Sequence, residues 1–152
     1  VIPRHREALS KLARQFQERR IDKTYIARVA GHVAADAGEC DLPLIADWPN
    51  RPKQKVCFDM GKQALTRWRV LTRDDKSSLL ILNPVTGRSH QLRIHMREIG
   101  HPILGCDFYA PEAVLSAAPR LLLHATSLRF RHPLSGEMLT AHSPAPAAFY
   151  PS

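Results

Sequence analysis

Residues 86–96, Thr-Gly-Arg-Ser-His-Gln-Leu-Arg-Ile-His-Met, join a predicted strand to a predicted helix. The strand is the apolar run 79–82, and it should end at Pro84, because proline has no N–H to donate to a sheet. Gly87 permits a tight turn after the strand. Ser89 has the side chain of a good helix N-cap. The sequence therefore predicts a strand, a turn and a helix that begins near Ser89.

The predicted helix is amphipathic and short. Leu92, Met96 and Ile99 recur at helical spacing and define one apolar face. Gly100 stands where a glycine commonly ends a helix. Arg93 lies on a neighbouring face, where it is either a solvated surface arginine or a fixed cation beside a cleft. Residue pattern alone leaves both interpretations open.

The remaining chain predicts an α+β fold with a largely antiparallel sheet, about five strands and two or three helices. Hairpin connections and the lack of regular strand–helix alternation are typical of this class. The expected elements are a helix over 4–20, a strand over 24–29 closed by Gly31, an irregular segment over 32–64, a hairpin of strands 65–72 and 77–83, a short helix over 112–118, and strands over 121–130 and 137–142.

Size and charge restrict the function. The chain has 152 residues, which fits a single domain, and its 22 basic and 14 acidic residues give a net charge of +8. This balance indicates a polyanionic partner, with nucleic acid favoured over a membrane, since no long apolar run is present. Three cysteines without metal-type spacing read as reduced thiols, which predicts a cytoplasmic protein.

Seven basic residues lie between positions 51 and 73, a segment in which Asp59 is the only acidic residue. A solvated surface usually mixes the two signs, so the pattern favours contact with RNA phosphates. Trp48 precedes the cluster in a proline-rich segment, where it either stacks on a base or packs into the core. The basic residues are Arg51, Lys53, Lys55, Lys62, Arg67, Arg69 and Arg73.

Other chemistries find little support. Eight histidines are present, but His90 and His95 are five residues apart and would lie on different faces of a helix, so we expect no metal site. The sequence has neither the Gly-x-Ser-x-Gly pattern of a nucleophile elbow nor a glycine-rich phosphate loop. We expect no cofactor.

Four segments of the sequence carry a resemblance to one known family. They are residues 86–95 followed by 100–105, residues 23–29 with Gly31, residues 121–125 with His132-Pro133 and Gly136, and residues 41–57, which include Asp-Leu-Pro-Leu and Trp-Pro-Asn-Arg-Pro-Lys-Gln-Lys. The first closely resembles motif III of the RluA-type pseudouridine synthases, the second resembles that family's tyrosine motif, and the third matches its closing strands. The fourth resembles the dual-specificity RluA branch.

The resemblance implies conversion of uridine to pseudouridine in RNA without a metal or organic cofactor. It implies a bent, largely antiparallel mixed sheet with flanking helices, and RNA partners that include a tRNA anticodon stem-loop and a large-subunit rRNA hairpin. It assigns catalytic roles to Tyr25 and Arg93. The expected RNA-binding residues are Trp48, Arg51, Lys53, Lys55, Arg88, His90 and Gln91.

One departure from the family pattern concerns the nucleophile. The family's aspartate lies in a His-Arg-Leu-Asp motif that residues 1–152 do not contain, so we expect this single domain to lack the N-terminal portion of the catalytic domain. Cys106 stands where the family usually has aspartate. The alternatives are a non-catalytic RNA-binding module and, more distantly, a metal-dependent nuclease. A sheet edge left open at the N-terminus could pair with a second copy.

Overall fold

The computed structural model describes residues 22–131, 135, 137–146 and 149. Its centre is a six-stranded sheet with the strand order β2-β5-β6-β1-β7-β8, in which every described pairing is antiparallel. The predicted helix over 4–20 and the residues His132-Pro133 and Gly136 lie outside the described residues. The strands of this sheet are β1 (Asp22–Ala30), β2 (Ala37–Asp41), β5 (Leu65–Arg73), β6 (Ser77–Pro84), β7 (Leu123–Arg131) and β8 (Met138–His142).

The middle of the sheet confirms the predicted strands. β5 and β6 form the expected hairpin, and β6 ends at Pro84 as its missing N–H requires. β1 pairs with β6 on one side and β7 on the other, and it stops before Gly31, whose φ of 87° suits glycine. Along β5 the buried Thr66 and half-buried Trp68 alternate with exposed arginines, as a two-residue repeat predicts.

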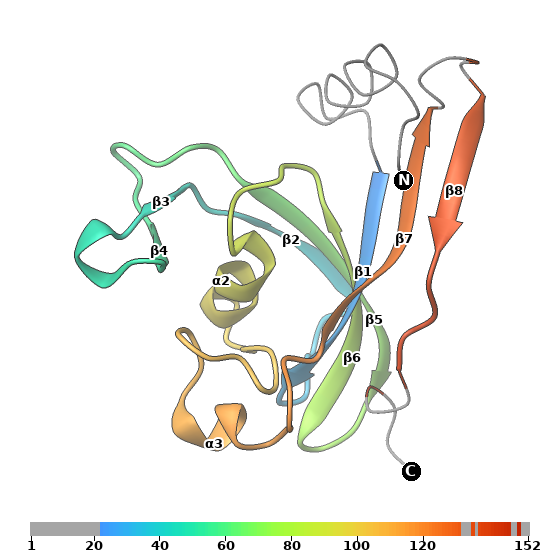
Figure 1. Ribbon diagram of the computed structural model, residues 1–152. Helices are drawn as coiled ribbons and strands as arrows, with labels where there is room; N and C mark the ends of the chain where they lie inside the picture. Colours follow the sequence, from blue (N-terminus) through green and yellow to red (C-terminus); the bar gives the residue numbers. More distant parts are fainter. Residues whose placement is uncertain (1–21, 132–134, 136, 147–148, 150–152) are drawn as a thin grey trace.

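The expected irregularity of residues 32–64 is wrong in part. β2 forms one edge of the main sheet, and β3 (Leu44–Ala46) pairs with β4 (Gln54–Val56) in a separate hairpin, closed by the 3₁₀ turn η1 (Trp48–Asn50). Figure 1 shows this β3–β4 hairpin standing apart from the sheet, with α2 between them. The strands are only three to five residues long, which is too short for periodicity to distinguish them from loop.

Helix α2 (Gln91–Glu98) begins later than expected. The residue before it is His90, in the left-handed conformation with φ 57°, so the predicted N-cap role of Ser89 is wrong. The Gln91 side chain instead accepts the Arg88 backbone N–H at 3.1 Å and closes the turn from within the helix. Gly100, with φ 93°, donates its N–H to the Arg97 carbonyl at 3.0 Å and ends the helix as predicted.

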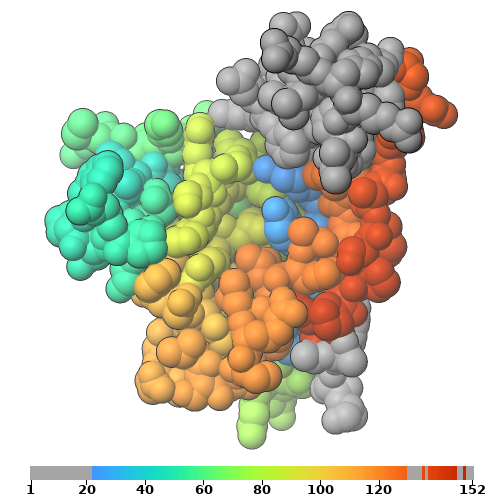
Figure 2. Space-filling model, in the orientation of Figure 1, coloured from blue at the N-terminus to red at the C-terminus, as the bar shows by residue number. Residues whose placement is uncertain are grey.

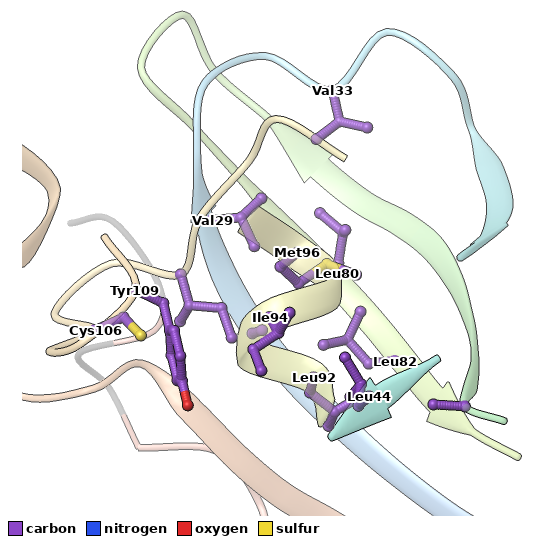
Figure 3. Packing of buried hydrophobic residues seen from close by; sticks show 13 residues of the cluster. Val29, Val33, Leu44, Leu80, Leu82, Leu92, Ile94, Met96, Cys106 and Tyr109 are labelled. Carbon is purple, nitrogen blue, oxygen red and sulfur yellow. The ribbon is translucent and has the colours of Figure 1, made fainter. Parts of the chain in front are cut away.

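The core lies between α2 and one face of the sheet. Leu92 and Met96 are buried as predicted, and Ile94 is fully buried beside them. Figure 3 shows Met96 beside Leu80 and Leu92 beside Leu44, and these residues belong to one buried cluster with Ile94 and Val29. Burial of each such side chain stabilises the fold by about 1.5–3 kcal/mol. The helix is therefore anchored along most of its circumference, which leaves Arg93, Arg97 and Glu98 as its outward positions.

The other face of the sheet holds a smaller cluster of Leu79, Leu122 and Phe149. The short helix α3 (Glu112–Leu115) lies within the predicted range 112–118 but covers only four residues of it. Among the described residues, no helix is long and apolar enough to cross a membrane. The α+β class and the largely antiparallel sheet predicted from the sequence are confirmed.

Candidate active site

A cavity of about 270 Å³ opens between β1 and the turn that leads into α2. Both residues that the sequence nominates for catalysis, Tyr25 and Arg93, line it. Arg88, His90 and Gln91 line it as well, so much of the predicted site comes together here. Figure 2 shows atoms of β1, in blue, between the yellow atoms around α2 and the orange atoms of β7. The remaining lining residues are Lys23, Pro84, Thr86, Gly87, Leu92 and Leu123.

Tyr25 reaches the cavity from the middle of the sheet. It is paired with Leu82 of β6 and Ala125 of β7, and the β1–β7 register shifts just before it, between Thr24 and Tyr25. Its ring is half-buried against the apolar cluster beneath α2. A ring fixed by two neighbouring strands presents a rigid, partly exposed aromatic surface to the cavity.

Arg93 is held firmly by residues that follow α2. Its Nη2 donates to the Asp107 carboxylate, with which it forms an ion pair, and to the Asp107 carbonyl oxygen at 2.9 Å. Its Nε lies 3.3 Å from Cys106 Sγ. The side chain is only 13% exposed, so it is not a solvated surface arginine. Within the described part of the chain, Nη1 has no hydrogen-bond partner and remains able to bind a second acceptor.

Two aromatic rings pack against this guanidinium. Arg93 Cζ lies 5.5 Å from the ring centre of Phe108 and 5.2 Å from that of Tyr109. Phe108 is 43% exposed, and its backbone adopts φ 64°, an uncommon conformation for a bulky residue. Burial alone would lower the pKa of Arg93, but its bonds to Cys106 and Asp107 raise the pKa above its usual value. The guanidinium is therefore a permanent, oriented cation.

His90 links the turn to the same aromatic cluster. Its Nδ1 lies 2.5 Å from the Tyr109 hydroxyl, which also accepts the Gln54 backbone N–H at 2.9 Å. Burial, followed by the charge of Arg93, lowers the pKa of His90. A neutral imidazole with an unprotonated Nδ1 can accept a hydrogen bond from the Tyr109 hydroxyl. Because the same hydroxyl accepts from Gln54 of β4, Tyr109 connects the residue before α2 to the β3–β4 hairpin.

A chain of buried polar groups supports the turn from beneath. Gln91 Nε2 donates to Thr66 Oγ1 at 2.9 Å, and Thr86 donates to Gln91 Oε1 at 2.5 Å. Thr66 Oγ1 lies 2.8 Å from His95 Nδ1, and His95 Nε2 lies 2.9 Å from the Leu42 carbonyl. Gln91 was predicted to bind RNA, but its side-chain amide already forms hydrogen bonds within the protein through both Oε1 and Nε2. The geometry assigns it to holding the turn.

The β3–β4 hairpin carries the other predicted RNA-binding residues. Trp48 is 66% exposed, so the alternative in which it packs into the core is wrong, and the Arg51 guanidinium lies 4.9 Å from its ring centre. Lys53 Nζ lies 5.8 Å from the Phe108 ring, and Lys55 is exposed. A second cavity of about 450 Å³ lies between this hairpin and residues 87–89, and Gly87 and Arg88 line both cavities.

The basic cluster from residue 51 to residue 73 does not form one surface. Arg67 and Arg69 lie on β5 beyond the hairpin, where their exposed side chains alternate with the inward Trp68. Arg67 pairs with Glu39 and Arg73 with Asp36. The seven residues therefore do not lie on one surface, and RNA contact by those near the cavities stays a prediction.

Residue pattern did not single out three side chains at this site. Lys23 lies two residues before Tyr25, so the two-residue repeat of a strand could have placed it on the same face. Asp107 and Phe108 are fourteen and fifteen positions beyond Arg93, in a turn without regular structure. No local signal connects them to α2, because the contact depends on how the chain returns after the helix.

This combination of a cationic cavity, a strand tyrosine and an anchored arginine on an antiparallel α+β sheet fits an RNA-modifying enzyme of the class that the motifs resemble. The family model for RNA pseudouridylate synthase matches residues 1–98. The chain belongs to this family and is of its RluA type.

Curated relatives agree over most of the chain. A dual-specificity RNA pseudouridine synthase RluA of Yersinia pestis is 56% identical over 137 residues, which cover 90% of this chain and 66% of the relative. The protein of the same name from Escherichia coli strain K12 is 51% identical over 146 residues, covering 95% and 67%. This chain therefore spans about two thirds of the length of these relatives.

Solved structures support the same fold. Human RNA pseudouridylate synthase domain containing 1 superposes with a TM-score of 0.80 at 28% identity, covering 93% of this chain and 61% of the human chain. Human RNA pseudouridylate synthase domain containing 4 superposes with a TM-score of 0.74 at 24% identity, covering 95% of this chain and 66% of the human chain, and shows that the fold is shared.

Proposed function

We propose that the protein carrying this chain isomerises uridine to pseudouridine in structured RNA. The observation that supports this most directly is the shared cavity of Tyr25 and Arg93, in which an aromatic ring and a fixed cation face one nucleotide-sized space. The cavity is close to the lower end of the range for small-molecule sites, so it suits a single extruded nucleotide better than a duplex.

In this proposal Tyr25 contacts the nucleotide base and Arg93 contacts the nucleophile. The target uridine leaves its stem-loop and its base stacks on the Tyr25 ring, whose hydroxyl removes the proton from the newly bonded carbon. Arg93 binds the carboxylate of the nucleophilic aspartate. Its contacts to Cys106 and Asp107 use Nε and Nη2, so Nη1 is available for that carboxylate.

The nucleophile would come from residues that precede Val1, in a His-Arg-Leu-Asp motif. The aspartate attacks the nucleotide, either at the ribose or at the uracil ring; the uracil detaches, turns and rejoins through carbon. None of the described residues that line the cavity is acidic, which supports an external source for the carboxylate. We accordingly propose that residues 1–152 form the larger part of one catalytic domain.

The substrates we propose are a tRNA anticodon stem-loop and a hairpin of large-subunit rRNA. The two RluA relatives carry dual specificity in their names, and the β3–β4 hairpin lies within the matched residues. Its exposed Trp48, Arg51 and Lys55 provide stacking and phosphate contacts that do not require one sequence. Three free cysteines agree with a cytoplasmic location.

The test of this function is made on the protein at its full length. Tyr25→Phe keeps the ring and removes the hydroxyl, so the variant should bind RNA normally and release finished pseudouridine at least 100-fold more slowly. Arg93→Lys should fail similarly, since an ammonium lacks the planar donor fork. Mass spectrometry of digested RNA provides the measurement. Turnover at the wild-type rate in either variant would contradict the role assigned to that residue.

A non-catalytic RNA-binding module is the second candidate, and the lack of an acidic residue among the described cavity lining favours it for this chain by itself. The chain incubated with tRNA should bind without forming pseudouridine. Product from the purified chain would place the nucleophile within residues 1–152. Self-association through a sheet edge, for which β2 and β8 are the described candidates, would show as a dimer mass in light scattering.

A further inference from the structure

Lys23 occupies a position at the site that the proposed chemistry does not use. It lies two residues before Tyr25 on β1, so both side chains leave the same face of the sheet about 6.6 Å apart along the strand. Lys23 and Tyr25 line the catalytic cavity, and both also line an adjoining hollow of about 350 Å³ against β7 and β8. The Lys23 side chain thus lies between the catalytic cavity and the adjoining hollow.

The charge of Lys23 is unbalanced in the described part of the protein. Arg93 is paired with Asp107, and Arg88 donates through Nε to the Gln63 carbonyl at 2.8 Å. Lys23 has no ion pair or side-chain hydrogen bond to any described residue, and neither cavity has an acidic residue in its described lining. Burial lowers the pKa of Lys23, because a half-buried ammonium has lost part of its hydration. An anionic ligand would restore that stabilisation.

The turn before α2 passes close to this ammonium. Gly87 does not have the positive φ of a glycine-requiring turn, so the predicted reason for this glycine is not the operative one. A Cβ placed on Gly87 would lie 3.0 Å from Lys23 Nζ, closer than ordinary van der Waals contact. Without a side chain at position 87, Lys23 Nζ lies directly against the turn, and both residues line the same cavity.

We propose that Lys23 binds the backbone phosphate of the nucleotide whose base stacks on Tyr25. This inference rests on the proposed function and names a substrate contact for it. A base and its own phosphate are separated by one ribose, which is comparable to the separation of two side chains on one strand face. Arg93 serves the nucleophile and Arg88 is bonded through Nε to the Gln63 carbonyl, whereas Lys23, beside Tyr25, has no side-chain bond to a described residue and is free to fix the sugar–phosphate chain. The contact forms in the ground state and persists through the reaction.

Salt dependence of binding tests the charge. The chain is titrated with a stem-loop RNA that carries a loop uridine, over a series of salt concentrations. Lys23→Gln should weaken binding about tenfold, equivalent to one charge-assisted hydrogen bond, and reduce the slope of log K against log salt by about 0.7–0.9. Lys23→Arg should retain the slope. Lys76→Gln is the matched control, because exposed Lys76 lies at the opposite end of β6 and should change neither quantity.

A neutral linkage in the RNA identifies the phosphate. Replacing the phosphodiester on one side of the loop uridine with methylphosphonate should weaken wild-type binding about tenfold and leave Lys23→Gln binding unchanged. In the full-length enzyme, Lys23→Gln should raise KM with kcat within about twofold of wild type.

Three results would overturn the assignment of Lys23. The first is an unchanged salt slope in Lys23→Gln, and the second is a large fall in kcat at unchanged KM, which would indicate that Lys23 partners the nucleophile. If the wild-type chain binds no stem-loop RNA, the proposed function fails first and this inference fails with it. Binding by the wild type with equal sensitivity of both proteins to methylphosphonate would reject Lys23 alone.

Discussion

Thr66→Val is a sharp test of the buried polar chain beneath the turn at residues 86–90. Thr66 is fully buried on β5, and valine has nearly its shape without the hydroxyl. That hydroxyl is consistent with donation to His95 Nδ1 at 2.8 Å while it accepts from Gln91 Nε2 at 2.9 Å. The substitution therefore removes two hydrogen bonds. It leaves His95 Nδ1 without a partner and one N–H of Gln91 Nε2 unsatisfied, while the other N–H keeps its bond to the Leu65 carbonyl at 2.9 Å.

The expected magnitude follows from these two groups. Each buried polar group left without a partner costs about 1–3 kcal/mol, so the free energy of unfolding should fall by roughly 3 kcal/mol, within a possible total of about 2–6 kcal/mol. For a chain of 152 residues this corresponds to a fall in Tm of about 6–12 °C. Because Gln91 Oε1 also accepts the Arg88 backbone N–H, the turn should loosen and RNA affinity should fall as well.

Urea unfolding followed by circular dichroism gives the stability, and fluorescence anisotropy gives the RNA affinity, both at pH 7.5. Thr72→Val provides the matched control, since Thr72 is exposed on the same strand and should shift stability by less than about 0.5 kcal/mol. A loss below about 1 kcal/mol in Thr66→Val would refute the argument. It would mean that the hydrogen bonds contribute little or that the site rearranges around valine.

Two further predictions use the same assays. Burial lowers the pKa of His95, whose side chain is fully buried, so the native protein binds a proton there less readily than the unfolded chain. The free energy of unfolding should therefore keep its full value above about pH 6.5, the ordinary histidine pKa, and should fall as pH decreases below it. Unfolding curves that are unchanged from pH 7.5 to pH 5 would contradict this. Trp48→Ala should leave stability within about 0.5 kcal/mol but weaken RNA binding by about 1–3 kcal/mol, as loss of a stacking platform requires.

The sequence was most informative where periodicity and burial coincide. The β5–β6 hairpin, β1 and the apolar face of α2 all follow from repeats of two or about 3.6 residues, because each element has one face in the core. Gly31 and Gly100 lie at the ends of elements as predicted. Both adopt a positive φ, which glycine does more readily than other residues. Prediction succeeded there because the relevant interaction is local or depends only on the side facing the core.

The errors have a common physical origin in long-range contact. β2 is defined by pairing with β5, more than twenty residues away, and Gly38 packs beside Trp68 with no room for a Cβ. The N-terminus of α2 was misplaced because Gln91, rather than Ser89, bonds to the turn. Neither a distant partner strand nor the choice between two polar side chains can be deduced from local propensity.

The contacts of Arg93 change what the departure at Cys106 means. A family position that usually holds aspartate is a buried thiol here, with Sγ 3.3 Å from Arg93 Nε, and this would by itself leave the arginine a weaker partner. The next residue, Asp107, supplies both its carboxylate and its carbonyl to Nη2. The arginine thus keeps a carboxylate on one side while Nη1 stays available on the other. A guanidinium held in this way can orient a second carboxylate without reorganising, and such preorganisation is what an ion pair needs in order to assist catalysis.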